Sequence, residues 1–310
     1  MFSVIFPGQG SQVVGMASEL YSKYDLIKKY FKEADDVLKL SISKIILEGP
    51  DTELNLTENT QPAVFLVSYS IYKLMTENFG IKLENAKYFA GHSLGEYSAI
   101  TCAGGISFHD CLRVLQVRGK AMQSALNNSK GSMLAILGSE INFIENILDE
   151  NKNDFKCYIA NDNSNQQIVV SGLNQDIEKF IEVLKNLKIK NIKLPVSAPF
   201  HCMLMSPAKV HIKNILEKVH IKELNNPIIS NVTANVINDI AELPNLLINQ
   251  VEKRVRWRES INFMVDNNIN DFIEIGPGKV LSNLIKRINK NVNVTSINSD
   301  KDMKEMISRI

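Results

Sequence analysis

A serine between two glycines is the residue of this chain best placed for covalent chemistry. Residues 91–95 read Gly-His-Ser-Leu-Gly, a G-x-S-x-G pattern centred on Ser93. The apolar run 88–90 precedes it and a helix-compatible segment, 94–102, follows. Strand, sharp turn and helix form the nucleophile elbow of serine enzymes, in which glycines flank the serine because the turn leaves no room for Cβ atoms. The pattern also fits a glycine-lined turn with no catalytic role, so the residues that surround Ser93 must distinguish the two interpretations.

A serine hydroxyl needs a base within hydrogen-bond reach before it becomes a good nucleophile. Of the five histidines, one adjoins Ser93 and would point away from it, and three lie on predicted helices: His92, His109, His211 and His220. His201 lies in the irregular segment "APFH" and follows Ser93 in the order seen in elbow enzymes. Loops at the ends of parallel strands are where α/β proteins build sites. His201 is therefore the best candidate base, with a packed loop histidine as the alternative.

The elements expected around these residues form two kinds of sheet. Up to about residue 127, short apolar strands (4–6 and 88–90) alternate with amphipathic helices, such as 63–79 and 108–126, which predicts a helix-covered parallel sheet. Ser107 and Asp110 make a capping box for the second helix. Residues 128–197 follow the order β-α-β-β-α-β of ferredoxin-like domains. We therefore predict one α/β domain, residues 1–127 and 198–310, that carries an inserted α+β subdomain at 128–197.

Composition excludes several classes of protein. The chain has 310 residues, 45% hydrophobic and 22% charged, as in ordinary globular proteins, and its net charge of +1 argues against nucleic acid as a partner. No signal peptide and no run of about 18 apolar residues is evident, so we expect a cytoplasmic protein. The four cysteines lack metal-site spacing and are read as reduced thiols: Cys102, Cys111, Cys157 and Cys202. Cys202 adjoins His201, but neighbouring side chains rarely point at each other.

Two glycine-rich segments resemble nucleotide loops but fail their tests. In "FPGQGSQ", the third glycine of G-x-G-x-x-G would fall on Val13. In "EIGPGKVLS", a Walker A motif would need glycine at Ile273 and Ser or Thr at Val280. The second segment is best explained as a turn. The first, placed beside the elbow, has backbone N–H groups that could serve an oxyanion hole.

Taken together, the motifs resemble those of the malonyl-CoA:acyl carrier protein transacylases of bacterial fatty-acid synthesis and the acyltransferase domains of polyketide synthases. The resemblance covers essentially the whole length. It rests on five segments in order: "FPGQGSQ" (6–12), "GHSLGEYSA" (91–99), "VRGKAMQ" (117–123), "APFH" (198–201) and "EIGPGKVL" (274–281). It implies an α/β-hydrolase-like domain with a ferredoxin-like insertion.

The resemblance also implies roles for residues at the matching positions. Ser93 would be the acylated nucleophile, and His201 would be its general base and later the acid for the leaving thiolate. The backbone N–H groups of Leu94 and Gln9 would form the oxyanion hole. No obvious aspartate completes a triad, since Asp154, Asp162 and Asp176 fall in the insertion. The backbone carbonyl of Gln250 would orient His201 instead.

Other matching positions would select the substrate. Arg118 would bind the free carboxylate of a malonyl group, for which a guanidinium offers two parallel hydrogen bonds that a lysine cannot reproduce. Phe200 resembles the version of its motif that selects malonyl over methylmalonyl. Asn231 aligns with an asparagine near the site, and His92 is a further candidate. On its own, Arg118 is one arginine on a predicted helix.

The implied reaction is a ping-pong transfer from malonyl-CoA to the phosphopantetheine thiol of an acyl carrier protein, with no metal or redox cofactor and with the enzyme as a monomer. Carrier proteins are usually acidic, so a basic docking patch is expected. Two clusters qualify, although each could be a solvated face: Lys185, Lys188, Lys190 and Lys193, or Lys279, Lys286 and Arg287.

Several alternatives stay open. A serine esterase or thioesterase shares the elbow but needs no arginine, and a free-standing polyketide acyltransferase shares the chemistry but serves another pathway. A catalytically dead scaffold that binds a carrier protein is disfavoured by the presence of Ser93, His201 and Arg118 together. The segment after Gln250, "EKRVRW", is more basic than the family pattern, which leaves contacts of Arg254 or Arg256 with substrate open.

Overall fold

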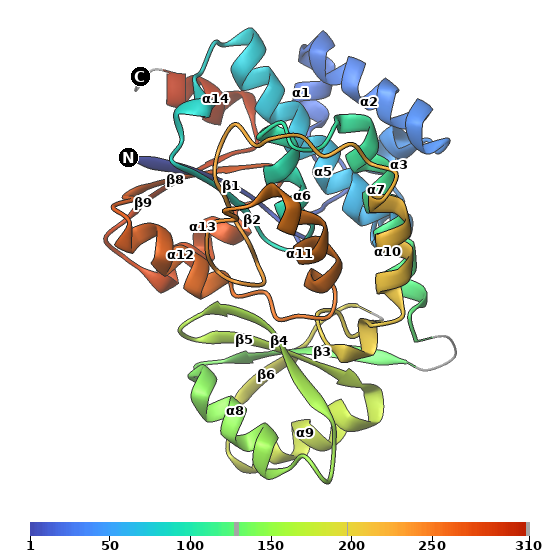
Figure 1. Cartoon of the computed structure of the whole chain (residues 1–310), viewed down its shortest axis with the longest axis vertical. Helices are drawn as coiled ribbons and strands as arrows, with labels where there is room; N and C mark the ends of the chain where they lie inside the picture. The colour runs from blue at the N-terminus through green and yellow to red at the C-terminus, as the bar shows by residue number, and fades with distance from the viewer. Residues whose placement is uncertain (127–129, 197, 308–310) are drawn as a thin grey trace.

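Two separate sheets organise the chain in a computed structural model that describes residues 1–126, 130–196 and 198–307 (Figure 1). One is a five-stranded parallel sheet and the other a four-stranded antiparallel sheet. This combination confirms the predicted fold class.

The parallel sheet holds the elbow. Its strand order is β7-β2-β1-β8-β9, with β1 (Phe2–Phe6), β2 (Tyr88–Gly91), β7 (Ile228–Ile229), β8 (Asp271–Ile275) and β9 (Asn293–Ile297). β1 lies in the middle and pairs in parallel with β2 and with β8. All four residues of β2 are buried, as expected of a strand covered on both faces.

Helices cover both faces of this sheet, and α5 (Thr57–Lys73) is one of the largely buried helices that approach the site. The apolar pattern predicted this helix from residue 63, but it begins at Thr57. The prediction missed the first turns because they are polar, yet Thr57, Thr60 and Gln61 are buried. The last turns, Leu74–Asn78, are π-helical. α6 (Leu94–Cys102) and α7 (Phe108–Ser124) complete the layer, and Ser107 caps α7 as predicted.

The large body contains further helical segments. They are α1 (Ser18–Lys23), α2 (Asp25–Leu38), α3 (Ile42–Glu48), α4 (Asp51–Leu54), η2 (Leu83–Asn85), η3 (Met203–Met205), α10 (Ala208–Leu216), η4 (Ile240–Glu242), α11 (Leu243–Gln250), α12 (Trp257–Asp266), α13 (Val280–Ile288) and α14 (Asp300–Ile307). α10 ends at Leu216, so the exposed His220 lies beyond the helix predicted to carry it. Within the described ranges, no helix has the length and apolar character to cross a membrane.

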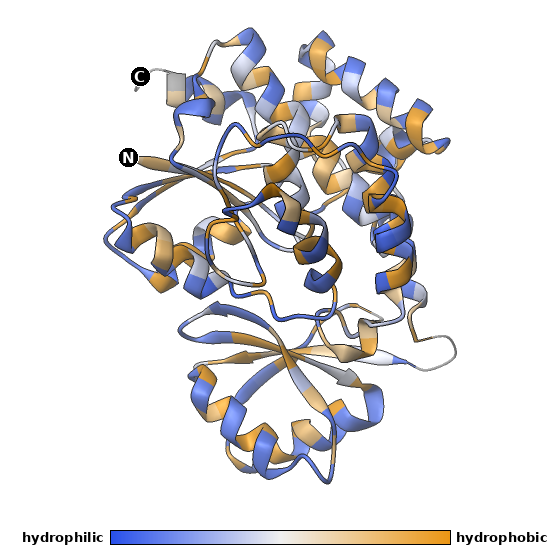
Figure 2. Cartoon of the chain, in the orientation of Figure 1, coloured by the Kyte–Doolittle hydropathy of each residue, from blue (hydrophilic) through white to orange (hydrophobic). Residues whose placement is uncertain are grey.

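The antiparallel sheet is the predicted ferredoxin-like insertion. Its strand order is β4-β5-β3-β6, with β3 (Gly131–Leu137), β4 (Cys157–Ser164), β5 (Gln167–Leu173) and β6 (Lys190–Lys193). α8 (Ile141–Glu150) and α9 (Asn174–Asn186) cover its outer face, and hydrophilic residues occupy the side of these helices turned away from the sheet (Figure 2). The predicted subdomain boundaries fall on residues 127–128 and 197, outside the described ranges, so they stay a prediction.

β4 joins this sheet to the large body. The N–H of Asp162 donates to the carbonyl of Val255 (2.9 Å), and the N–H of Val255 donates to the carbonyl of Ala160 (2.8 Å). The fully buried carboxylate of Asp162 also pairs with Arg258 on α12 (2.8 Å). The end of β4 is therefore held at the parallel sheet, beside Ser93.

Candidate active site

Ser93 lies on a strained turn between β2 and α6. Its φ of 53° and ψ of −109° place it in a region that side chains rarely adopt. The flanking glycines are required by space, because a Cβ on Gly91 would lie 1.9 Å from the carbonyl oxygen of Gly95. A Cβ on Gly95 would lie 2.2 Å from that of Phe6 in β1. The strand-turn-helix geometry of the predicted nucleophile elbow is present.

His201 meets Ser93 as predicted. The Oγ of Ser93 lies 2.7 Å from Nε2 of His201, and Nδ1 of His201 lies 2.8 Å from the backbone carbonyl oxygen of Gln250. Because a carbonyl oxygen can only accept, Nδ1 carries the proton and Nε2 keeps its lone pair for the serine O–H. Ser93 is therefore paired with a neutral imidazole in the tautomer of a general base.

His201 is almost completely buried, and this sets its charge state. Burial lowers its pKa from 6.5 to about 3, and the positive charge of Arg118 adds to the effect. The imidazole thus stays neutral throughout the physiological pH range. A neutral histidine can accept the serine proton, whereas an imidazolium cannot.

Arg118 lies at the bottom of the site with 1% of its surface exposed. One terminal nitrogen donates to Oε1 of Gln61 (2.7 Å), and the other donates to Oε1 of Gln250 (2.7 Å) and to Oγ of Ser93 (3.1 Å). Its Nε has no acceptor in the described part of the chain. All of these partners are neutral, so the guanidinium offers its charge and its donors to a ligand beside Ser93.

Gln250 and Asn231 hold the backbone of the elbow. Nε2 of Gln250 donates to the carbonyl of Ser93 (3.0 Å), and Oδ1 of Asn231 accepts from the N–H of Ser93 (2.7 Å). Nδ2 of Asn231 donates to the carbonyl of Gly91 (2.7 Å). These two side chains bind the polar groups that the strained turn would otherwise leave unpaired.

The two predicted oxyanion donors lie at this turn. Leu94 is the first residue of α6, so its N–H has no acceptor within the helix and points from the positive end of the helix dipole. The segment that contains Gln9 presses against the elbow, because a Cβ on Gly8 would lie 2.5 Å from the carbonyl oxygen of His92. Gln9, Ser93 and Leu94 line one cavity. Two backbone N–H groups beside a nucleophile can stabilise a developing oxyanion.

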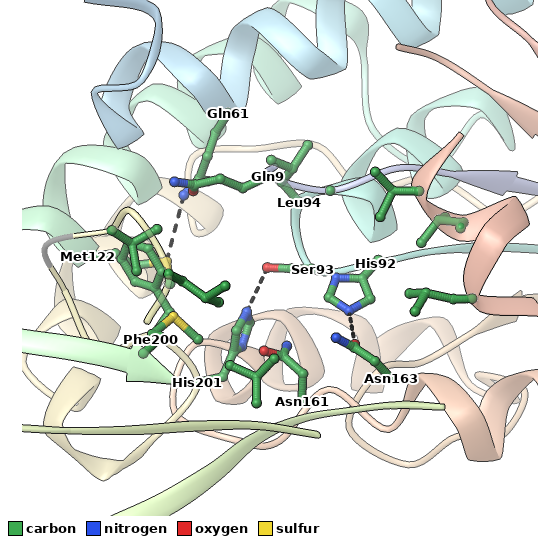
Figure 3. Close-up of a pocket in the computed structure, with 18 of the residues that line it drawn as sticks. Gln9, Gln61, His92, Ser93, Leu94, Met122, Asn161, Asn163, Phe200 and His201 are labelled. Atoms are coloured by element: carbon green, nitrogen blue, oxygen red, sulfur yellow. Dashed lines mark hydrogen bonds between the residues drawn. The ribbon is translucent and has the colours of Figure 1, made fainter. Parts of the chain in front are cut away.

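The cavity around Ser93 is narrow and lies between the two sheets (Figure 3). Its volume is about 150 Å³, small beside the roughly 300–1,000 Å³ of sites for drug-sized ligands. Phe200, Met122 and Met133 form part of its apolar wall, and Arg118 and Gln61 supply polar groups. The space suits a short acyl group that carries a charge, and excludes a long chain.

Comparison with known proteins identifies the family. The acyl transferase domain family matches residues 3–305. The malonyl CoA-acyl carrier protein transacylase of Bacillus subtilis (strain 168) is 40% identical over 295 residues, which cover 94% of this chain and 92% of the relative. The chain belongs to the malonyl CoA-acyl carrier protein transacylase family.

Solved structures agree with this family assignment. An acyl-carrier-protein S-malonyltransferase from Bartonella henselae superposes with a TM-score of 0.96 at 40% identity and covers 99% of this chain and 98% of its own. A malonyl-transacylase solved in complex with a type II polyketide synthase acyl carrier protein has a TM-score of 0.95 at 33% identity, and the match covers 100% of this chain and 99% of that one.

The structure adds residues that the sequence analysis missed. Gln61 binds Arg118, Glu96 contacts Gln250 and Asn231, and Asn161 and Asn163 of β4 line the cavity. Glu96 belongs to the "GHSLGEYSA" segment, and this was the one available signal in the sequence. The other three lie in segments without a motif.

His92, the further candidate, points away from the nucleophile. Its Nε2 lies 2.8 Å from Oδ1 of Asn163 (Figure 3), and its ring packs against Trp257. Burial lowers its pKa, so the ring is neutral. The side chain of His92 therefore connects the elbow to β4, and it is not a partner of the Ser93 hydroxyl.

Several other sequence candidates lie apart from the cavity. His109 contacts Glu33 at the surface, Arg254 pairs with Glu145, and Arg256 pairs with Glu259. The Sγ of Cys202 lies 3.0 Å from the carbonyl oxygen of Pro199, and burial raises the pKa of this thiol to about 12, which makes it a poor nucleophile. Among the residues that the structure describes, no cluster of three or more His, Cys, Asp or Glu forms a metal site.

Proposed function

We propose that the protein transfers a malonyl group from malonyl-CoA to the phosphopantetheine thiol of an acyl carrier protein through an ester on Ser93. The observation that carries this proposal is the position of Arg118. A buried guanidinium whose hydrogen-bond partners are all neutral lies 3.1 Å from the nucleophile, where the carboxylate of a malonyl ester would reach it. Neither an ordinary esterase nor an acetyl transferase needs a cation there.

In the first half-reaction, Oγ of Ser93 attacks the thioester carbonyl while Nε2 of His201 takes the hydroxyl proton. The carbonyl oxygen becomes an oxyanion, which the N–H groups of Leu94 and Gln9 stabilise. The tetrahedral intermediate then breaks its C–S bond. The CoA sulfur leaves with the proton held by His201, and the malonyl group stays on Ser93.

In the second half-reaction, His201 takes the proton of the carrier protein thiol, and the sulfur attacks the ester carbonyl. The C–O bond to Ser93 breaks, and Oγ recovers the proton from His201. The carbonyl of Gln250 holds the imidazole in the same tautomer in both directions. Both steps transfer groups without net oxidation, so we expect activity without a metal or a redox cofactor.

Arg118 selects the acyl group. It can offer parallel charge-assisted hydrogen bonds to the malonyl carboxylate, and the neighbouring Gln61 fixes its plane. Phe200 and the two methionines of the wall leave little space beside the acyl chain. Malonyl is therefore favoured over uncharged acyl groups by charge and over branched ones by space.

We further propose that the carrier protein docks across α13, which carries Lys286 and Arg287 at its exposed end. Val280, Leu281 and Leu284 of this helix line the cavity, whereas the lysines of α9 and β6 lie on the insertion. Reversing both charges with Lys286→Glu and Arg287→Glu should slow transfer to the carrier protein and spare acylation by malonyl-CoA. Equal slowing of both half-reactions would contradict this docking site. The monomeric state, cytoplasmic location and pathway stay predictions.

The deciding experiment is the intact mass of the protein after brief mixing with malonyl-CoA or acetyl-CoA. We expect a gain of one malonyl group, little gain from acetyl-CoA, and no gain with Ser93→Ala. Addition of a phosphopantetheinylated carrier protein should then remove the group and become malonylated. CoA release without retained mass and without response to the carrier protein would indicate a hydrolase. No adduct and no CoA release would indicate a scaffold.

A further inference from the structure

Glu96 is a buried carboxyl group directly behind the nucleophile. It is the third residue of α6, and only 1% of its surface is exposed. Its Oε1 has no hydrogen-bond partner within the described ranges. A carboxyl in such a place is costly unless other contacts require it.

Glu96 is connected through two hydrogen-bonded neighbours to the nucleophile, the base and the buried arginine. Its Oε2 accepts from Nε2 of Gln250 (2.5 Å) and from the backbone N–H of Asn231 (3.3 Å). Gln250 in turn accepts from Arg118 with its side chain and from His201 with its backbone carbonyl. Asn231 holds the N–H of Ser93.

The contact with Glu96 helps to fix which end of the Gln250 amide faces Arg118. A primary amide has one accepting oxygen and one donating NH₂ group, which are nearly equal in size. Glu96 and the backbone carbonyl of Ser93 both accept from the NH₂ end, so the oxygen is turned toward the guanidinium. In the reversed amide, donors would face donors, and Arg118 would lose one of its acceptors.

We propose that Glu96 is a positioning residue that holds Gln250 and thereby aims Arg118, which makes it a determinant of selectivity for acyl groups with a carboxylate. This inference rests on the proposed malonyl transfer. Glu96 itself touches neither Ser93 Oγ nor the cavity. Loss of its contact with Gln250 should therefore slow transfer of a malonyl group more than transfer of an uncharged acyl group, because only the malonyl group depends on Arg118.

Stability alone does not account for this carboxyl group. Burial raises its pKa to about 7, so the fold works against its ionisation. An apolar side chain on the same face of α6 would avoid this penalty. The carboxyl group contributes the hydrogen bond to Gln250 and a favourable electrostatic interaction with Arg118.

Two variants of nearly the same size separate this role from packing. Glu96→Leu removes the acceptor, and Glu96→Gln keeps an amide oxygen that can accept from Gln250. The readout is the ratio of the second-order acylation rate constants for malonyl-CoA and acetyl-CoA in single turnovers. We expect Glu96→Leu to lower this ratio on the order of tenfold, as for loss of one hydrogen bond to a charged group. Glu96→Gln should stay within about threefold of the wild type.

Ser98→Ala is the matched control, because Ser98 is buried on the same helix and its hydroxyl has no partner in the described structure. It should leave the ratio unchanged. Glu96→Met also removes the acceptor, with a more flexible side chain, and serves if Glu96→Leu does not fold; it should lower the ratio similarly. An unchanged ratio in the folded leucine variant, or an equal fall of both rates, overturns the inference. A wild type that forms no malonyl ester refutes the proposed function instead.

Discussion

At the scale of single residues, the unusual feature is a buried positive charge that forms no hydrogen bond to an acid; the buried Glu96 acts on it only through space. Arginine is almost never fully buried unless it is paired. The partners of Arg118 are the neutral side chains of Gln61, Ser93 and Gln250. Burial lowers its pKa, although a guanidinium stays protonated in proteins. A substrate carboxylate would supply the missing negative charge. Selectivity for an acyl group with a carboxylate therefore follows from the burial of Arg118.

Removing the guanidinium should therefore affect one class of substrate. For Arg118→Ala we expect the activation free energy of acylation by malonyl-CoA to rise by about 2–5 kcal/mol, because the carboxylate would be buried unpaired. The acylation rate constant should therefore fall roughly 30- to 5,000-fold. The rate for acetyl-CoA should change by less than about tenfold. Single-turnover acylation with each donor measures both. Arg113→Ala, an exposed arginine of the same helix, is the control. A parallel fall for both donors would show that Arg118 is structural.

The low pKa of His201 predicts an unusual pH dependence. A base with the ordinary pKa of 6.5 would be mostly protonated at pH 5 and the reaction would slow, whereas His201, with a pKa of about 3, should stay neutral. We expect protonation of His201 to cause no loss in the rate of acylation by malonyl-CoA between pH 8 and pH 5. Glu96 also titrates, near pH 7, so the profile should be measured in Glu96→Gln as well. An acid limb near pH 6.5 in both proteins would refute the assignment.

The same shift affects stability with a definite sign. The unfolded chain binds the His201 proton near pH 6.5, whereas the folded chain does not bind it until about pH 3. The contribution of His201 to the free energy of unfolding is therefore fully present above pH 6.5, and it is lost as the pH falls from 6.5 to about 3.

At the scale of elements, the elbow depends on close contact between β1 and α6. A Cβ on Gly95 would meet the carbonyl oxygen of Phe6 at 2.2 Å, and neither backbone can move without displacing Ser93. We expect Gly95→Ala to lower the free energy of unfolding by roughly 2–4 kcal/mol, within the range of severe single substitutions. Urea unfolding measures this, with Ser98→Ala as the control. A variant as stable as the wild type would show that the strand and helix can separate without cost.

Elements show why some of the site could be predicted and some could not. The elbow, the inserted β-α-β-β-α-β order and the candidate base His201 rest on local patterns, which survive in the folded protein. Gln61 and Glu96 were missed because their partners lie far away in sequence: Arg118 is 57 positions after Gln61, and Gln250 is 154 positions after Glu96. Polar residues such as these carry no periodic signal. Only the family resemblance separated Arg118 from other helical arginines.

At the scale of the whole molecule, the cavity exists only because the two sheets are held together. Ser93, Gln9 and Arg118 come from the large body, whereas Met133, Val169 and Asn161 come from strands of the insertion. His92 bonds to Asn163, and Val255 pairs with β4. The insertion thus forms one wall of the acyl site, and its attachment to the large body determines the width of the cavity.

The ion pair between Asp162 and Arg258 is the strongest polar part of this attachment. Asp162 is fully buried, and both of its oxygens accept from Arg258, at 2.8–3.1 Å. Removal of one partner from a buried pair leaves an uncompensated charge, at a cost of about 3–5 kcal/mol. Arg258→Gln should lower the free energy of unfolding by that order and raise KM for malonyl-CoA, because Asn161 and Asn163 flank Asp162 at the cavity.

Two further variants decide whether the pair acts by charge. Arg254→Gln breaks a more exposed pair with Glu145 and should change the free energy of unfolding by less than about 1 kcal/mol, with KM unchanged. Adding Asp162→Asn to Arg258→Gln removes the stranded charge, so it should restore most of the stability measured by urea unfolding. If the double variant is no more stable than Arg258→Gln, the arginine acts through packing. If stability falls in Arg258→Gln while KM stays constant, the attachment of β4 does not control the cavity.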